Sequence, residues 1–218
     1  MLRPSLPLLE KVGHVNVVCR GYVALARIHA ARGQDGIALQ TLEHARSLLP
    51  GNGRGRLRTL SLIEATAGAI AQRRCQHPVI ANALARLGVD PGDTVPAPDA
   101  WERPAATRAL LQARLFLLHG EAERALALAT ALVHSARAAG RRAAVLEYLL
   151  LAAAAAQAAG DTDACDRHAD AALAVAEAAG MVRTVAEAPP VLVPVLQRRL
   201  TGAGGTRHAR RLQAALAE

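Results

Sequence analysis

Aromatic residues are scarce in this chain, and lysine is almost missing from it. Phe, Trp and Tyr account for 2% of the 218 residues, although hydrophobic residues together account for 52%. β-Sheets draw on aromatic and β-branched residues, so a sequence dominated by alanine and leucine favours closely packed helices over a sandwich or a barrel. Each small side chain buries little surface, so such a fold must gain its stability by stacking many helices.

Cysteine and long hydrophobic runs are also scarce. Cys19, Cys75 and Cys165 are an odd number with no close pair, which is typical of a reducing cytosol and not of a disulfide framework. A secretory leader would begin with a basic segment followed by an apolar one, and the first residues do not show this pattern. The longest uncharged apolar run, residues 148–156, is far below the roughly 20 residues that span a bilayer. We therefore expect a soluble, cytoplasmic chain with no membrane partner.

Acidic residues are too few to balance the basic ones. The formal net charge is +8, and 25 of the 26 basic residues are arginine. A basic balance can indicate nucleic acid, but these arginines are scattered and the two tyrosines are too few to stack bases. Arginines do gather near the end of the sequence, where we favour a solvated face of terminal helices over a nucleic-acid site: Arg198, Arg199, Arg207, Arg210 and Arg211. We expect no direct contact with nucleic acid.

The residue patterns of catalysis are missing too. The histidines include no i, i+4 pair, no G-x-S-x-G is present, and paired carboxylates for acid–base chemistry are lacking. No G-x-x-x-x-G-K-[ST] exists, and Lys11, the single lysine, lies in no glycine loop, so a P-loop is excluded. We expect no enzyme activity, no catalytic residue and no cofactor.

What the sequence does have is a regular glycine spacing. Gly120, Gly140, Gly160 and Gly180 stand twenty residues apart, and glycine suits the left-handed position that ends a helix. Between the glycines, apolar residues fall on one helical face, as at Ala122, Ala125, Leu126, Ala129, Leu132, Val133 and Ala136. Two helices per forty residues, repeated, predict an all-α solenoid of helical hairpins with about ten helices.

Breaker residues divide the rest of the chain. Clusters of proline and glycine interrupt the helical periodicity at several points, and they predict five segments. These are a lead-in (1–14), a first set of helical repeats (15–88), a Pro-rich loop (89–103), a second set of repeats with a closing helix (104–200), and a Gly-rich turn with a basic C-terminal helix (201–218).

Three passages together resemble a known family. Residues 21–34 resemble the first recognisable repeat of the C-terminal superhelical region of MalT-like, LuxR-family transcriptional regulators, and residues 110–129 resemble its central hairpin. Residues 138–161, with 176–196 after them, resemble the closing signature of that region. The likeness covers roughly residues 16–200, and it implies tetratricopeptide-like hairpins wound into a right-handed superhelix.

The resemblance also implies a function. In such regulators a nucleotide-binding switch domain precedes this region and a helix-turn-helix domain follows it, and we expect neither within this sequence. The chain would then be the sensor module, which binds a small-molecule inducer or a regulatory protein on its concave surface. The alternative is a stand-alone scaffold for protein–protein interaction. Self-association into a homo-oligomer stays open.

Five polar residues are candidates for binding. The first helix of each hairpin is expected to line the concave surface, and these helices carry Arg27, Arg58, Arg108, Arg114 and Glu147. Glu147 stands alone in an apolar helix, so its charge needs a partner if it is buried. We favour an ion pair with an arginine such as Arg114 over a polar contact in the groove.

One acidic cluster carries metal-ligating residue types. It consists of Asp161, Asp163, Asp166, His168 and Asp170, with Cys165 among them. Zinc sites normally show a second pair of ligands, which this cluster lacks. We expect Asp161 to cap a helix and Asp163 to favour the positive end of that helix, with no metal bound.

Overall fold

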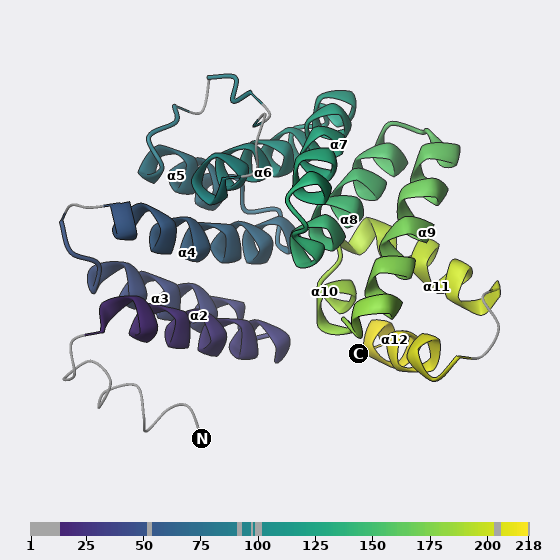
Figure 1. Cartoon of the computed structure of the whole chain (residues 1–218), viewed down its shortest axis with the longest axis horizontal. Coiled ribbons are helices and arrows are strands. Elements are labelled where there is room, and N and C mark those ends of the chain that lie inside the picture. The colour runs from purple at the N-terminus through teal and green to yellow at the C-terminus, as the bar shows by residue number, and fades with distance from the viewer. Residues whose placement is uncertain are drawn as a thin grey trace. The chain divides into compact units, whose positions relative to one another are not determined.

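The secondary structure of the described residues is entirely helical. The computed structural model describes residues 14–51, 54–90, 93–96, 98, 102–202 and 206–217 (Figure 1). The predicted lead-in therefore lies outside the described residues except for His14, as does part of the Gly-rich turn. The helices are α2 (Val15–Ala31), α3 (Asp35–Ser47), α4 (Arg54–Arg73), α5 (His77–Arg86), α6 (Arg103–Leu118), α7 (Ala122–Ala138), α8 (Arg142–Ala158), α9 (Thr162–Ala179), α10 (Arg183–Ala186), the 3-10 helix η1 (Pro190–Leu192), α11 (Val193–Gly202) and α12 (Arg207–Ala217). The all-α prediction is confirmed.

Helices pair in chain order as antiparallel hairpins. The hairpins are α2–α3, α4–α5, α6–α7 and α8–α9, and we call α2, α4, α6 and α8 the first helices and α3, α5, α7 and α9 the second helices. Glycine ends the helices as predicted, because Gly120 and Gly160, for example, have φ of 80° and 78°. Pro78 stands in the first turn of α5, where its missing N–H costs nothing.

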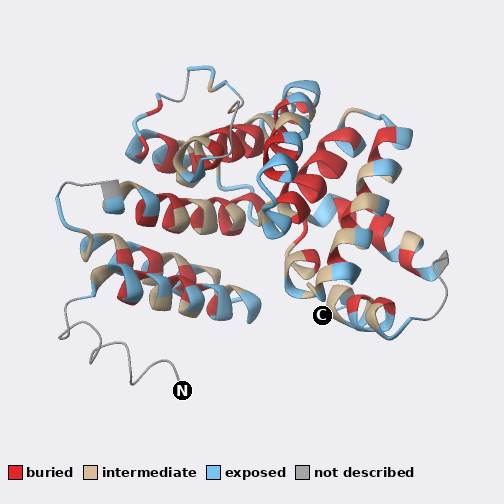
Figure 2. Ribbon diagram, viewed as in Figure 1, coloured by how far each residue is buried: buried red, intermediate tan, exposed pale blue. Residues whose placement is uncertain are grey.

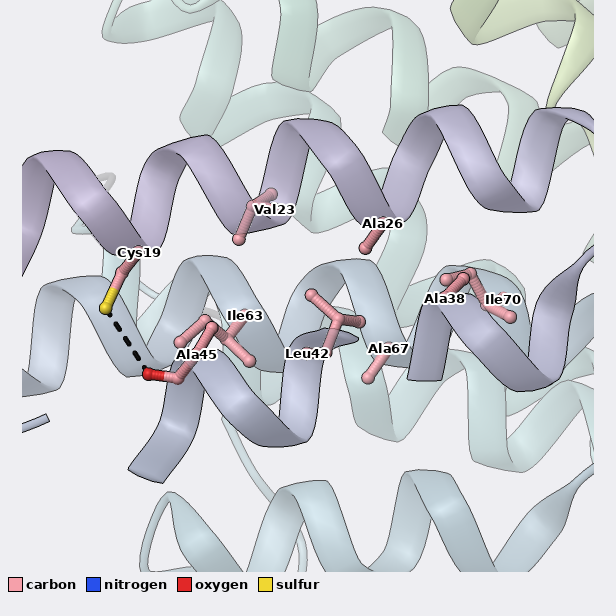
Figure 3. Packing of buried hydrophobic residues seen from close by; sticks show 9 residues of the cluster. All are labelled: Cys19, Val23, Ala26, Ala38, Leu42, Ala45, Ile63, Ala67 and Ile70. Carbon is pink, nitrogen blue, oxygen red and sulfur yellow. Dashed lines mark hydrogen bonds between the residues drawn. The ribbon is translucent and has the colours of Figure 1, made fainter. Parts of the chain in front are cut away.

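The chain divides into two compact units, residues 1–93 and 94–218. In the first unit α4 packs on both α2 and α3, and nine buried residues form the shared core (Figure 3). The Cys19 thiol in this core donates to the carbonyl oxygen of Ala45 at 3.3 Å, and burial raises the pKa of that thiol. The division falls within the predicted Pro-rich loop, and the five-segment division itself stays a prediction.

In the second unit, α8 is the central helix. Helices α7 and α9 pack along it, and α6, α10 and η1 also contact it. Every residue from 148 to 156 is buried, so all sides of the helix are covered over this length (Figure 2). Small alanines make this packing feasible, since they allow several helices to approach one axis closely. The solvent-accessible part of α8 is therefore limited to its two ends.

The chain closes on α11 and α12. η1 packs on α8, α11 packs on α9 and η1, and α12 packs on α10 and α11. From η1 through α11 the buried residues follow a helical period, and they are Leu192, Val195, Leu196 and Leu200. The predicted closing helix thus exists.

One hairpin turn breaks the glycine rule. Cys75 has a φ of 51° at the end of α4, where the other hairpin turns have glycine. The N–H of Gln76 donates to the carbonyl of Ala71 at 2.9 Å, which is the hydrogen bond that closes a helix around a left-handed residue. A residue with a Cβ is strained in this conformation.

We predict that Cys75→Gly stabilises the chain by about 0.5–1 kcal/mol, because relief of the left-handed strain exceeds the entropy that glycine loses on folding. Urea denaturation followed by circular dichroism measures the change. Gly120→Ala is the matched reverse variant. An added Cβ meets no atom within 4 Å at this position, so the cost of the substitution comes from the left-handed backbone conformation alone. We expect a loss of about 1 kcal/mol for that variant, and a loss for both variants would contradict the account.

Candidate binding surface

The five predicted binding residues all lie on first helices. Arg27 on α2 and Arg58 on α4 belong to the first unit, and both are exposed. Half-buried Arg108 and buried Arg114 on α6, with half-buried Glu147 on α8, belong to the second unit. Each unit therefore has arginine side chains on its first helices.

The structure joins two of these residues directly. Nη2 of Arg114 donates to Oε1 of Glu147 at 2.6 Å, which links α6 to α8. The Arg114 side chain is 6% exposed and that of Glu147 is 36% exposed. The expected ion pair is confirmed. Because residues 148–156 of α8 are covered, Glu147 lies at the edge of the accessible N-terminal part of this helix.

We predict that Glu147→Ala destabilises the chain by about 1–3 kcal/mol, because nearly buried Arg114 loses this carboxylate. The loss is smaller than for a fully buried pair, since Glu147 keeps part of its contact with water. Urea denaturation measures it. Glu177→Ala, which removes an exposed acid from α9, is the control and should stay within about 0.5 kcal/mol. Equal losses for the two variants would mean that the pair contributes nothing.

The first unit holds an ionic cluster that the sequence analysis missed. Glu64 on α4 is fully buried, and its carboxylate accepts hydrogen bonds from Nε of Arg46 at 2.7 Å and from Nη2 at 3.0 Å. Nη1 of Arg86 on α5 lies 3.7 Å from the same carboxylate. Glu64 thereby connects α3, α4 and α5. The sequence does contain an indication that Glu64 needs a cationic partner. Glu64 is the single acid of α4 and has apolar neighbours, as Glu147 has in α8.

The charge of Arg46 is maintained by this cluster. Burial by itself would lower the pKa of the guanidinium. The hydrogen bonds and charge of Glu64, together with those of Glu43, outweigh burial and raise that pKa. The guanidinium of Arg46 therefore stays charged, and its hydrogen bonds to Glu64 link the two hairpins of the unit.

The acidic cluster of α9 has structural roles. The side chain of Asp161 accepts a hydrogen bond from the N–H of Ala164 at 2.8 Å, which confirms the predicted cap. Within the described residues, no group of three or more His, Cys, Asp or Glu side chains is arranged to hold a metal ion. Burial first, and then the charges of Arg167 and Arg137, lower the pKa of His168, so its imidazole is neutral at pH 7.

Two arginines of the C-terminal run form ion pairs with acidic residues of α9. Arg199 on α11 binds both carboxylate oxygens of Asp170, with Nε at 2.7 Å from Oδ1. Arg198 and Arg199 each reach Asp166 at 3.3 Å. Arg198 is 63% exposed and so lies on the solvated face that we expected, whereas Arg199 is 34% exposed. The sequence pattern does not reveal the ion pairs, because they form where α11 returns to pack on α9. The arginines of α12, Arg207, Arg210 and Arg211, are exposed.

Stacked hairpins of this kind define a tetratricopeptide-like helical-repeat protein, in which each hairpin buries its apolar face against its neighbours. The model of the MalT-like TPR region matches residues 1–201, and the chain belongs to this family. It is thus a regulatory tetratricopeptide-like region. No curated protein matches the chain significantly. Over the part of the chain that is described, no helix combines the length and the apolar character needed to cross a bilayer.

Proposed function

We propose that this chain is the signal-sensing module of a cytoplasmic, MalT-like, LuxR-family transcriptional regulator. It binds a small-molecule inducer or a regulatory protein on the exposed faces of its first helices. The match to the MalT-like TPR region over residues 1–201 carries this proposal. The positions of Arg27, Arg58 and Arg108 support it, since each places a guanidinium on a first helix.

The sensing mechanism is a shift between two arrangements of the repeats. A ligand that binds one arrangement more tightly shifts the population toward it by the difference between its two binding free energies. The ion pair of Arg114 with Glu147 lies between two first helices, so a movement of α6 against α8 would change its geometry. The chain needs no catalytic step for this role, and we expect no substrate turnover.

The test is thermal unfolding of the purified chain against sugars and other small metabolites. A ligand at about 100 times its Kd adds about 2.7 kcal/mol, which raises the Tm by about 5–10 °C in a chain of this length. Arg58→Ala should reduce the shift if the ligand binds the first unit, and Arg108→Ala should reduce it if the ligand binds the second. Arg167→Ala, on the second helix α9, should leave the shift unchanged in either case. If no metabolite stabilises the chain and no transcriptional regulatory protein is retained on it, the sensor proposal is wrong. Retention of a protein with no role in transcription would instead identify an interaction scaffold.

A further inference from the structure

The two first helices of the first unit lie side by side and run in the same direction. Near their N-terminal ends, Oγ1 of Thr59 on α4 donates to Oδ1 of Asn16 on α2 at 2.8 Å. Further along, residues of both helices share the core cluster, with Val23 and Ala26 on α2 and Ile70 on α4 (Figure 3). The two helices therefore present equivalent faces to the same side.

Each of these helices has a stripe of residues that the shared core leaves exposed or only partly buried. The stripes have the same i, i+4, i+7, i+11 spacing, which places their members on one helical face. They are Val17, Gly21, Ala24 and Ile28 on α2, and Arg58, Leu62, Ala65 and Ala69 on α4. Val17 is 54% exposed and Ile28 is 38% exposed, and both are among the large apolar side chains that the structure leaves in water. We call these two stripes the α2–α4 face.

The surroundings of the α2–α4 face are cationic. Helix α2 contains no acidic residue, and its exposed side carries Arg20 and Arg27 beside the stripe. Asp35, Glu43 and Glu64 of the same unit are each paired with arginines of α3, α4, α5 or the turn after α4. Among the described residues, neither Arg20 nor Arg58 pairs with an acid. The unit therefore offers apolar surface flanked by positive charge.

We propose that the α2–α4 face binds an amphipathic helix of a partner protein, one that presents an apolar stripe with carboxylates along its flanks. Apolar side chains of that helix would cover Val17 and Ile28 and pack over the small residues of the α4 stripe, and its carboxylates would meet Arg20, Arg27 and Arg58. A second copy of this chain is a poor occupant, since it would bring arginine against arginine. The inference rests on the proposed function and names the chemistry of its protein partner.

A synthetic peptide tests this directly with the full chain. The probe is a fluorescein-labelled peptide of about 18 residues, with leucine at i, i+4, i+7 and i+11 and glutamate on both flanks. Binding is followed by fluorescence anisotropy, and we expect it to weaken as salt is added, because the flanking charges are exposed. A second peptide with lysine in place of every glutamate should not bind.

Two exposed isoleucines provide matched variants. Ile28→Asp places a charge on the α2–α4 face and should weaken binding of the glutamate peptide at least about tenfold. Ile37→Asp makes the same change on α3, where Ile37 is 43% exposed, and should leave binding unchanged. Both variants should fold, since both side chains are exposed, and circular dichroism verifies this.

Three results would overturn the inference: no binding of the glutamate peptide, equal binding of the lysine peptide, or equal effects of the two isoleucine variants. Its failure is separable from failure of the proposed function. A metabolite that raises the Tm of the wild-type chain and of Ile28→Asp alike would leave the sensor role standing while this partner chemistry fails.

Discussion

Replacing Glu64 with alanine is expected to destabilise the chain by about 3–5 kcal/mol, the largest loss that we predict from a single polar residue. The carboxylate is fully buried, and it is the group that neutralises Arg46, whose side chain is only 11% exposed. Without it, the Arg46 guanidinium would lie largely out of water with just the exposed carboxylate of Glu43 beside it. Arg86 would lose the same partner.

Glu43→Ala is the matched control for this prediction. Glu43 binds the same arginine at 2.5 Å, but its side chain is 65% exposed, so its loss should cost about 0–1 kcal/mol. Urea denaturation followed by circular dichroism compares the two variants under identical conditions. Equal losses would show that burial of Glu64 does not determine the strength of the cluster, and the account of how the two hairpins are held together would be wrong.

Leu42→Ala is expected to destabilise the chain by about 2–5 kcal/mol through loss of packing. Leu42 is fully buried in the core cluster of the first unit, and most of that cluster is small (Figure 3). Alanine methyl groups are fixed to their backbones and cannot move in to fill the space. The cavity would therefore persist, and the cost should approach the upper end of the range.

Leu39→Ala is the matched control for Leu42→Ala. Leu39 lies on the same helix and packs against the same cluster, but it is only partly buried. Its removal deletes less buried surface and leaves a space that water can enter, so we expect a loss of about 1 kcal/mol. Thermal and urea unfolding both report the difference. A loss at Leu42 no greater than that at Leu39 would mean that the core is loosely packed.

The sequence predicts most of the helices because their ends carry local signals. Glycine at Gly33, Gly88 and the later hairpin turns requires no knowledge of tertiary structure, and each of these residues has positive φ. The turn after α4 carries no such glycine, yet the neighbouring Pro78 still marks the start of the next helix. The sequence also indicates that α8 is covered on all sides, since the Tyr148 hydroxyl is the one polar side-chain group in residues 148–156.

Contacts between helices were harder to predict. The pairing of Glu147 with Arg114 could be inferred because a lone acid in an apolar helix needs a cation. Glu64 has the same need, but its partners lie on two other helices, and their rotation about their axes is not encoded in local periodicity. The ion pair of Arg199 with Asp170 depends on the path that the chain takes from η1 to α11, and the positions of the prolines alone do not determine that path.

Hydrogen–deuterium exchange of the intact chain, with and without bound ligand, tests the central claim most directly. The ligand is the metabolite that raises the Tm most or, if none does, the glutamate peptide. If recognition uses the first helices, backbone amides of α2, α4, α6 or the N-terminal part of α8 should gain more protection than those of α3, α5, α7 and α9. Protection confined to the second helices, or unchanged throughout the chain, would contradict the account.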